Sequence, residues 1–286
     1  MKVGIFYAYW VHNWDVDFHP FVEKVSDLGF DVLEVNAGTV ANMTVEARSA
    51  LKTHADDRGL DLSYVVGLQH KYDIASENES VRKNGIGFLK TIAEAVGEMG
   101  GGPVGGILYG AWPETPLDGD FDRRPSVERS VVSMKEAIKS AEDNNVTFNM
   151  EVVNRFEQFI MNTCEEAIDY VKAVESTNAK VMLDTFHMNI EEDFFGDAIL
   201  QAGDLLGHLH IGENNRMPPG YGRIPWTEIG AALRKINYQG YVVMEPFLMP
   251  GGEVGRDIKV FRDLAIGMDL DEEAHKALQF TRGVLK

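Results

Sequence analysis

Four side chains that could bind a metal ion each follow a short apolar run in the second half of the chain. They are Glu151, Asp184, His210 and Glu245. If these runs are parallel strands of one sheet, their carboxyl ends meet at one rim and bring the four side chains together. Three carboxylates and one imidazole form an oxygen-rich donor set. Such a set suits Mn²⁺, Mg²⁺ or Co²⁺ better than a structural zinc ion, which favours sulfur or several imidazoles.

The charge of this set also favours a cation. Three crowded carboxylates repel one another, so without a cation at least one of them must take up a proton. A bound dication removes that penalty. The alternative is that each acid caps the helix after its strand or pairs with a lysine or arginine. This alternative explains any one of the residues as well as a metal does, but it explains four on consecutive strands poorly.

Further polar groups lie just beyond these candidate ligands in the sequence. Glu157 shares a loop with Glu151, His187 follows Asp184, and Arg216 follows His210. All three could form hydrogen bonds with sugar hydroxyls. Taken singly, each could equally be a loop residue on the surface or a partner in a salt bridge.

Aromatic residues cluster in other loops of the same predicted rim. Trp10, His12 and Trp14 follow the first apolar run, and Trp112 follows the fourth. The C–H faces of sugars stack on such rings. The alternative is that these side chains only plug the top of the fold.

The pattern of the chain predicts strands that alternate with amphipathic helices. The expected strands span residues 2–7, 32–35, 63–66, 104–109, 147–150, 180–183, 206–209 and 241–244. Eight such repeats favour a closed parallel barrel over an open sheet. We therefore expect an α/β fold, a single (β/α)8 TIM-barrel domain over residues 1–286, with an extra C-terminal helix over 269–284.

Several helix boundaries are also predicted. Thr44 is expected to cap a helix over 45–57, and Thr163 with Glu166 has the spacing of a capping box for a helix over 163–175. Another helix is expected over 126–144. Gly29 and Gly59 are expected just past helix ends. The glycine-rich run 100–106 precedes a strand, so it predicts a turn and not a phosphate-binding loop.

Composition limits the classes of partner. The chain has 286 residues and a formal net charge of −18, which repels phosphate backbones and anionic lipid heads. We therefore expect no nucleic-acid or membrane partner. No apolar run approaches the roughly 20 residues of a membrane-spanning helix, the first residues lack the features of a signal peptide, and the single cysteine, Cys164, suits a reducing compartment. These features predict a cytoplasmic protein.

Four long motifs resemble those of the ketose 3-epimerases, the group of D-psicose (D-allulose) and D-tagatose 3-epimerases within the xylose-isomerase-like TIM barrels. The motifs are Glu-Val-Val-Asn-Arg-Phe-Glu at 151–157, Leu-Asp-Thr-Phe-His-Met-Asn at 183–189, His-Ile-Gly-Glu-Asn-Asn-Arg at 210–216 and Met-Glu-Pro-Phe at 244–247. The resemblance runs essentially from end to end of the chain.

This resemblance implies one divalent metal per subunit, Mn²⁺ or Co²⁺ with Mg²⁺ as a further option, held by Glu151, Asp184, His210 and Glu245. It implies that Glu151 and Glu245 are also the catalytic acid–base pair. The remaining implied residues contact the sugar: Glu157, His187 and Arg216 near O1 to O3, and Phe6, Trp14, Gly67, Trp112 and Phe247 elsewhere in the pocket. The expected partners are free ketoses and copies of the same chain, in a homodimer or homotetramer.

The implied reaction is metal-dependent C3 epimerisation of free ketoses, of the D-fructose/D-psicose or D-tagatose/D-sorbose type, with D-psicose 3-epimerase activity favoured. The metal would stabilise a cis-enediolate while one glutamate removes the C3 proton and the other returns a proton to the opposite face. Phe6 matches tagatose-type members, whereas several psicose-type members carry tyrosine there, so the preferred ketose stays open.

Two other functions fit the residues less well. One is another sugar isomerase of the same superfamily, such as an aldose–ketose isomerase, a hydroxypyruvate isomerase or an inosose dehydratase. The other is a sugar-binding protein without catalytic activity. A related apurinic endonuclease would need more histidine ligands and a basic face for DNA, and this chain is acidic.

Overall fold

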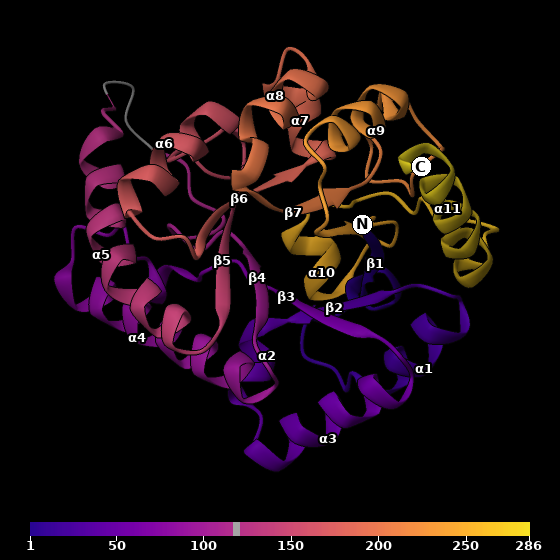
Figure 1. Cartoon of the computed structure of the whole chain (residues 1–286), viewed down its shortest axis with the longest axis horizontal. Coiled ribbons are helices and arrows are strands. Elements are labelled where there is room, and N and C mark those ends of the chain that lie inside the picture. Colours follow the sequence, from indigo (N-terminus) through magenta and orange to yellow (C-terminus); the bar gives the residue numbers. More distant parts are fainter. Residues whose placement is uncertain (117–120) are drawn as a thin grey trace.

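The computed structural model describes residues 1–116 and 121–286, and its centre is a closed parallel barrel in which each strand pairs with the next and β8 pairs with β1. The helices surround the strands in Figure 1. The strands are β1 (Lys2–Phe6), β2 (Val32–Asn36), β3 (Asp61–Val65), β4 (Gly102–Gly106), β5 (Val146–Glu151), β6 (Ala179–Asp184), β7 (Leu206–Ile211) and β8 (Tyr241–Met244). The predicted TIM barrel is confirmed.

Within the described residues, eight helices form the outer layer and pack their apolar faces on the strands. They are α1 (His19–Asp27), α3 (Val45–Asp57), α4 (Glu79–Glu98), α5 (Arg124–Asp143), α6 (Cys164–Val174), α8 (Phe195–Ala202), α9 (Trp226–Lys235) and the C-terminal α11 (Leu270–Leu285). Asp269 caps α11 by accepting hydrogen bonds from the N–H groups of Asp271 and Glu272. The predicted extra C-terminal helix is therefore confirmed. No helix in the described ranges is long and apolar enough to cross a membrane.

In the described residues, three short helices lie at the end of the barrel that carries the candidate ligands, and the first two begin directly after their strands. They are α2 (Ala37–Asn42), α7 (Thr185–Glu191) and α10 (Gly252–Asp257). Asn36 caps α2 by accepting a hydrogen bond from the Thr39 N–H at 2.9 Å, and Asp184 caps α7 through the Phe186 N–H at 2.8 Å. Single-turn 3-10 segments follow β1 (Tyr7–Trp10), precede α4 (His70–Tyr72) and precede β7 (Gly203–Leu205).

The predicted helix caps are confirmed. The Thr44 hydroxyl accepts a hydrogen bond from the Ala47 N–H at 3.2 Å, and α3 spans the expected residues. Thr163 and Glu166 form the reciprocal capping box of α6. Gly29 and Gly59 have φ values of +88° and +71° just past the ends of α1 and α3. These two glycines end their helices in a backbone conformation that other residues rarely adopt.

Two predicted boundaries are wrong. The helix expected from residue 126 begins at Arg124, because Pro125 occupies its first turn, where the missing N–H costs no hydrogen bond. Ser126 is thus a buried residue inside this helix. The strand expected over 104–109 spans Gly102–Gly106, so most of the glycine-rich run 100–106 forms this strand and not a turn before it. The strand ends at Gly106, whose φ of +109° takes the chain out of the extended conformation.

Gly106 also has no room for a side chain. A Cβ atom placed there would lie 2.2 Å from the carbonyl oxygen of Val66. We predict that Gly106→Ala lowers the free energy of unfolding by about 1–3 kcal/mol, because positive φ and a backbone clash both oppose it. Gly87 in α4 is the matched control. Its Cβ would meet nothing, so Gly87→Ala should stabilise the protein by about 0.5–1 kcal/mol. Chemical denaturation measures both changes, and an unchanged stability for Gly106→Ala would contradict the prediction.

Candidate active site

The four predicted ligands converge at the carboxyl end of the barrel. Glu151 and Asp184 end β5 and β6, His210 lies in β7, and Glu245 directly follows β8. One donor atom from each residue lies within 4.8 Å of the donor atoms of the other three. The side chain of Glu245 retains only 11% exposure and the other three are buried. The sequence therefore predicted correctly that these four residues meet.

The ring of His210 has a defined orientation. Its Nε2 atom lies 2.5 Å from Glu34 Oε1, which makes Nε2 the protonated nitrogen. Its Nδ1 atom points among the carboxylates, 3.6 Å from Glu151 Oε1 and 3.4 Å from Glu245 Oε1. Nδ1 is buried and has no hydrogen-bond partner within the described part of the chain. Once it has lost its proton, Nδ1 is a nitrogen donor that faces carboxylates, as a metal ligand must, so the donor set fits a divalent cation.

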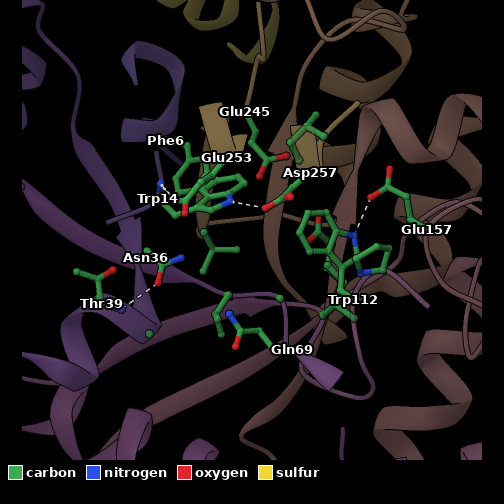
Figure 2. A pocket seen from close by; sticks show the side chains of 18 of the residues that line it. Phe6, Trp14, Asn36, Thr39, Gln69, Trp112, Glu157, Glu245, Glu253 and Asp257 are labelled. Atoms are coloured by element: carbon green, nitrogen blue, oxygen red, sulfur yellow. Dashed lines mark hydrogen bonds between the residues drawn. The ribbon is translucent and has the colours of Figure 1, made fainter. Parts of the chain in front are cut away.

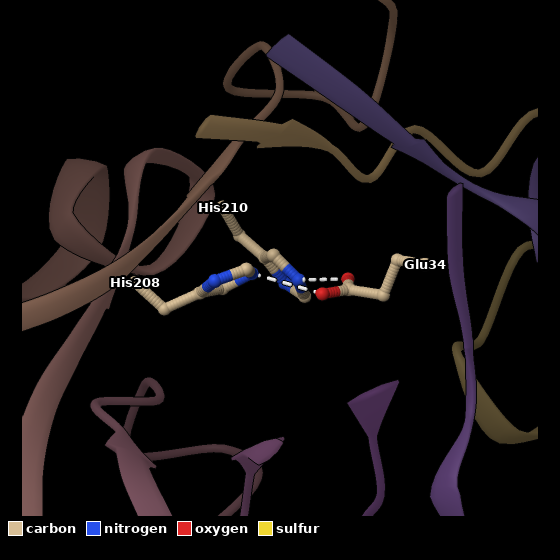
Figure 3. Close-up of side chains that lie close together, drawn as sticks. All are labelled: Glu34, His208 and His210. Atoms are coloured by element: carbon tan, nitrogen blue, oxygen red, sulfur yellow. Dashed lines mark hydrogen bonds and ion pairs between the residues drawn. The ribbon is translucent and has the colours of Figure 1, made fainter. Parts of the chain in front are cut away.

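Glu34 is the residue that orients His210, and Figure 3 shows this carboxylate facing the rings of His208 and His210. It is fully buried in the middle of β2. Its Oε2 atom accepts a hydrogen bond from the Ser63 hydroxyl at 2.9 Å and lies 2.9 Å from His208 Nε2. Burial acts to raise the pKa of Glu34, but the attraction of His210 and His208 outweighs it and holds this pKa below its usual range. Glu34 is therefore a buried anion beside the candidate metal ligands.

Sequence reasoning missed Glu34 and His208, although each left a signal. Glu34 interrupts the otherwise apolar run Val32-Leu33-Glu34-Val35, where a charged side chain must have a buried partner. His208 lies two residues before His210, so both rings are on the same face of β7.

The protonation of the cluster depends on the same contacts. Burial disfavours the charged form of His210, but the attraction of Glu34 and then Glu245 raises the pKa of this ring well above its usual range. Burial raises the pKa of Glu151, and the nearby Glu245 charge acts in the same direction. Without a cation, this cluster therefore retains protons at neutral pH.

Arg216 places a fixed positive charge on the same carboxylates. Its Nη1 atom lies 3.0 Å from Glu245 Oε2 and 3.1 Å from Asp184 Oδ2. Its guanidinium also lies over the ring of Phe186, 3.8 Å from the centroid. Burial opposes the charge on Arg216, but Asp184 and Glu245 raise its pKa further. Arg216 thus supplies one positive charge beside Asp184 and Glu245.

Glu213 fixes the loop that carries Arg216. Its buried carboxylate accepts hydrogen bonds from the Gly220 N–H at 2.7 Å and from Trp226 Nε1 at 2.8 Å. Its carbonyl oxygen accepts the Arg216 N–H at 2.9 Å. Arg216 itself has a φ of +64°, an unusual value for a residue with a side chain. The loop is thus a rigid support for the guanidinium.

His187 presents an N–H group to the cavity. Its Nδ1 atom accepts a hydrogen bond from the Asn154 backbone N–H at 3.1 Å, so the proton of the neutral ring lies on Nε2. Glu157 is held nearby, with Oε2 accepting from Trp112 Nε1 at 2.9 Å and Oε1 accepting from Asn154 Nδ2 at 3.1 Å. Burial acts to raise the pKa of Glu157, but His187 and Arg216 lower it below its usual range. These groups supply donors and an acceptor for hydroxyls.

A cavity of about 590 Å³ opens above this cluster, and Figure 2 shows side chains that line it. All eight residues that the resemblance assigned to sugar contacts line this cavity: Phe6, Trp14, Gly67, Trp112, Glu157, His187, Arg216 and Phe247. Glu151 and Glu245 also line it, whereas Asp184 and His210 are completely or almost completely buried.

The predicted aromatic cluster is only partly in the cavity. Trp14 and Trp112 line it. Trp14 is held by Asp257, whose Oδ2 accepts a hydrogen bond from the indole N–H at 2.9 Å. Trp10 instead donates its indole N–H to Asp271 of α11 at 2.7 Å. Because Trp10 is fixed against the C-terminal helix, for this ring the alternative of a packing role is correct.

Gly67 allows Trp112 to approach the cavity wall. A Cβ atom at residue 67 would lie 2.9 Å from Cε3 of the Trp112 ring. A larger residue there would therefore displace the indole, and with it the hydrogen bond to Glu157. On the opposite wall, the rings of Phe6 and Phe247 meet edge to face with centroids 6.2 Å apart.

Comparison with known proteins adds a second line of support. A family model described as a xylose isomerase-like TIM barrel matches residues 22–264. The chain is 46% identical to a D-psicose 3-epimerase of Ruminiclostridium cellulolyticum, over 100% of this chain and 98% of the relative. It is 44% identical to a D-psicose 3-epimerase of Agrobacterium fabrum, over 100% and 99%. A crystal structure of D-psicose 3-epimerase with D-tagatose from Clostridium cellulolyticum H10 superposes with a TM-score of 0.97 at 46% identity, covering 100% of both chains.

The raised pKa of His210 predicts that cation binding releases protons. The metal-free ring is protonated at pH 7, and a cation needs the Nδ1 lone pair, so Mn²⁺ must displace a proton. We expect about one proton released per ion and an affinity that rises about tenfold per pH unit near neutrality. Calorimetry at pH 7 in buffers of different ionisation enthalpy measures the number released. Binding without proton release would contradict the assigned protonation.

The contact between Glu34 and His210 predicts a second effect. Glu34→Gln removes the buried anion that orients the ring, so Mn²⁺ affinity should fall about 10- to 100-fold and proton release should decrease. Ser63→Ala is the matched control, because it removes another partner of Glu34 and leaves the His210 contact intact. Chelator competition measures the affinity, and circular dichroism checks the fold. Equal affinities for Glu34→Gln and the unaltered protein would contradict the role of Glu34.

Proposed function

Because the chain belongs to the ketose 3-epimerase family of xylose isomerase-like TIM barrels, we propose that it catalyses the metal-dependent C3 epimerisation of a free ketose. The observation that carries the proposal is the placement of two glutamates, one from the end of β5 and one just after β8. Glu151 and Glu245 both line the cavity and both lie within 3.6 Å of the unpaired Nδ1 atom of His210. Two carboxylates at one cation-binding cluster are what removal and return of a proton require.

In this proposal, Glu151, Asp184, His210 and Glu245 hold one divalent cation, Mn²⁺ or Co²⁺ with Mg²⁺ as a further option. A cation at this position would polarise the C2 carbonyl of the sugar and stabilise the negative charge that develops on the enediolate. The two buried residues, Asp184 and His210, chiefly form the floor of the site. Glu151 and Glu245 reach the cavity and can also exchange protons with the substrate.

The proposed catalytic step is a proton transfer at C3. One glutamate breaks the C3–H bond by taking the proton, and the electron pair moves toward the C2 carbonyl to give a planar cis-enediolate. The other glutamate delivers a proton to the opposite face of C3, which inverts that centre. Proton transfer between C1 and C2, through a 1,2-enediolate, would instead interconvert an aldose and a ketose.

The remaining cavity residues would fix the sugar. We assign Glu157, His187 and Arg216 to the hydroxyls next to the reacting carbons, because these groups lie beside the candidate metal ligands. The rings of Phe6, Trp14, Trp112 and Phe247, together with Gly67, would pack against the C–H faces of the rest of the chain. The proposed substrate pairs are D-fructose with D-psicose and D-tagatose with D-sorbose.

The same family membership leads us to propose a cytoplasmic homodimer or homotetramer. Light scattering of the purified protein at several concentrations measures the subunit number. A monomer at micromolar concentration would contradict this part of the proposal.

We predict that Glu151→Gln and Glu245→Gln each reduce C3 epimerisation at least about 10²- to 10⁴-fold, because each removes one proton-transfer group. The measurement is deuterium incorporation at C3 of D-psicose in D₂O, followed by NMR, with excess Mn²⁺ to offset any weaker metal binding. Glu253→Gln, a change at the cavity rim, is the matched control and should remain active. Near-normal exchange in both glutamine variants would rule out the assignment.

Product analysis tests the reaction itself. Chelated protein should not convert D-fructose, D-psicose, D-tagatose or L-ribulose, and added Mn²⁺ should restore interconversion of C3 epimers. Appearance of aldoses as the main products would instead favour an aldose–ketose isomerase. Tight sugar binding without turnover would favour a binding protein.

A further inference from the structure

The cavity is larger than one ketohexose needs. Its volume is about 590 Å³. A ketohexose has about twelve non-hydrogen atoms and fills roughly 200 Å³, on the scale on which one water molecule occupies about 30 Å³. A cavity of this volume lies in the range of pockets that hold ligands larger than one monosaccharide. The question is which chemistry the unused part of the cavity would recognise.

The unused part lies on the β2–β3 side of the barrel. The candidate catalytic residues come from β5 to β8, across the barrel from β2 and β3 in the closed strand order. We call the β2–β3 side the outer lobe, formed by residues that follow these two strands: Asn36, Thr39, Asn42, Gln69, Tyr72 and Phe88. In Figure 2, Asn36, Thr39 and Gln69 lie on one side of the cavity, away from Glu157 and Glu245.

The polar groups of the outer lobe are neutral donors and acceptors. Asn36 uses its side-chain oxygen to cap α2, at 2.9 Å from the Thr39 N–H, so its amide hydrogens remain available to a ligand. Gln69 is exposed at the rim, and the half-buried Thr39 also faces the cavity. Amides and a hydroxyl are the side chains that bind sugar hydroxyls without an ionic partner.

The outer lobe also contains a stacked pair of aromatic rings. Tyr72 and Phe88 stack with centroids 4.2 Å apart and an angle of 10° between their planes. Both rings are half-buried and line the cavity. The apolar surface that this pair leaves free beside the amides suits the C–H groups of a pyranose.

The charges around the outer lobe favour a neutral ligand over a phosphate. Lys71 also lines the cavity beside the outer lobe, and its ammonium group lies 4.8 Å from the centroid of the Tyr72 ring. Arg256 on the facing wall is paired with Asp257 at 2.8 Å. Asp15 and Glu253 add two further carboxylates to the lining of the same cavity. These acids would repel a doubly charged phosphate, whereas they would not repel a neutral sugar ring.

We propose that the outer lobe is a second sugar subsite, so that the protein epimerises ketoses carrying a neutral glycosyl group on O6. This inference rests on the proposed function, because the C1 to C3 end must react at the metal ligands. A substituent on O6 leaves the C2 carbonyl and the C3 hydroxyl free. The reaction is unchanged: one C3–H bond breaks, a new one forms on the opposite face, and no other reactant is needed.

The test compares D-fructose with 6-O-α-D-glucopyranosyl-D-fructose under identical conditions with Mn²⁺. We expect kcat/KM values within roughly tenfold of each other, because the second ring would be bound and not excluded. Turnover of D-fructose without turnover of the glucosyl derivative would overturn the subsite and leave the proposed function intact. Turnover of neither sugar would instead count against the proposed function.

Two variants locate the effect in the outer lobe. Thr39→Trp should fill the lobe and lower kcat/KM for the glucosyl derivative at least tenfold, with D-fructose within about twofold. Gln69→Ala should lower it about 3- to 10-fold by removing a hydrogen-bonding group. Gln201→Ala on the exposed face of α8 is the matched control and should leave kcat/KM unchanged for both substrates.

Two further outcomes would overturn the assignment. Circular dichroism checks that Thr39→Trp and Gln69→Ala are folded. If the folded variants have kcat/KM values lowered equally for both substrates, the outer lobe is not a separate subsite. If D-fructose 6-phosphate has a higher kcat/KM than the glucosyl derivative, the lobe recognises an anion and not a neutral ring.

Discussion

The concentration of negative charge at the carboxyl end of the barrel is the constraint on which the rest of the site depends. The carboxylates of Glu151, Asp184 and Glu245 offer oxygen atoms within 4.8 Å of one another. Glu245 is the most exposed of the three, and only 11% of its side chain is accessible. Such acids are stable only with protons, an arginine or a cation beside them. Arg216 supplies one charge from one side. The unpaired Nδ1 of His210 marks the place on the other side where a cation would bind.

This constraint accounts for buried groups that otherwise have no obvious purpose. Glu34 is a fourth acid in the barrel interior, and its negative charge is stabilised by two histidine rings and a serine hydroxyl. Its effect is to fix which nitrogen of His210 faces the other acids. Glu213 acts indirectly, because it fixes the loop from which Arg216 contacts the same carboxylates. The site is therefore supported by rigid contacts on strands and on a pinned loop.

Much of this arrangement could be predicted from the sequence, because parallel strands end at one rim. Glu151, Asp184, His210 and Glu245 each follow an apolar run, so the barrel topology alone brings them together. Family resemblance was needed for Phe6 and Gly67, which no spacing rule connects to a pocket. Glu34 was missed because its effect depends on contact with His210 across 176 positions of chain. Trp10 was placed with the cavity aromatics because sequence cannot tell which ring turns toward α11. The outer lobe could not be predicted from sequence spacing, because its shape depends on how α2 and the loop after β3 pack at the cavity.

The central claim is that Glu151, Asp184, His210 and Glu245 bind one cation that a ketose contacts directly. Anomalous diffraction at the manganese edge, from crystals soaked with Mn²⁺ and D-psicose, tests it most directly. The account predicts one peak bounded by these four side chains, with His210 Nδ1 as the nitrogen ligand and sugar oxygens completing the coordination. A peak between Glu34 and His208 instead, or no peak at the four residues, would contradict it.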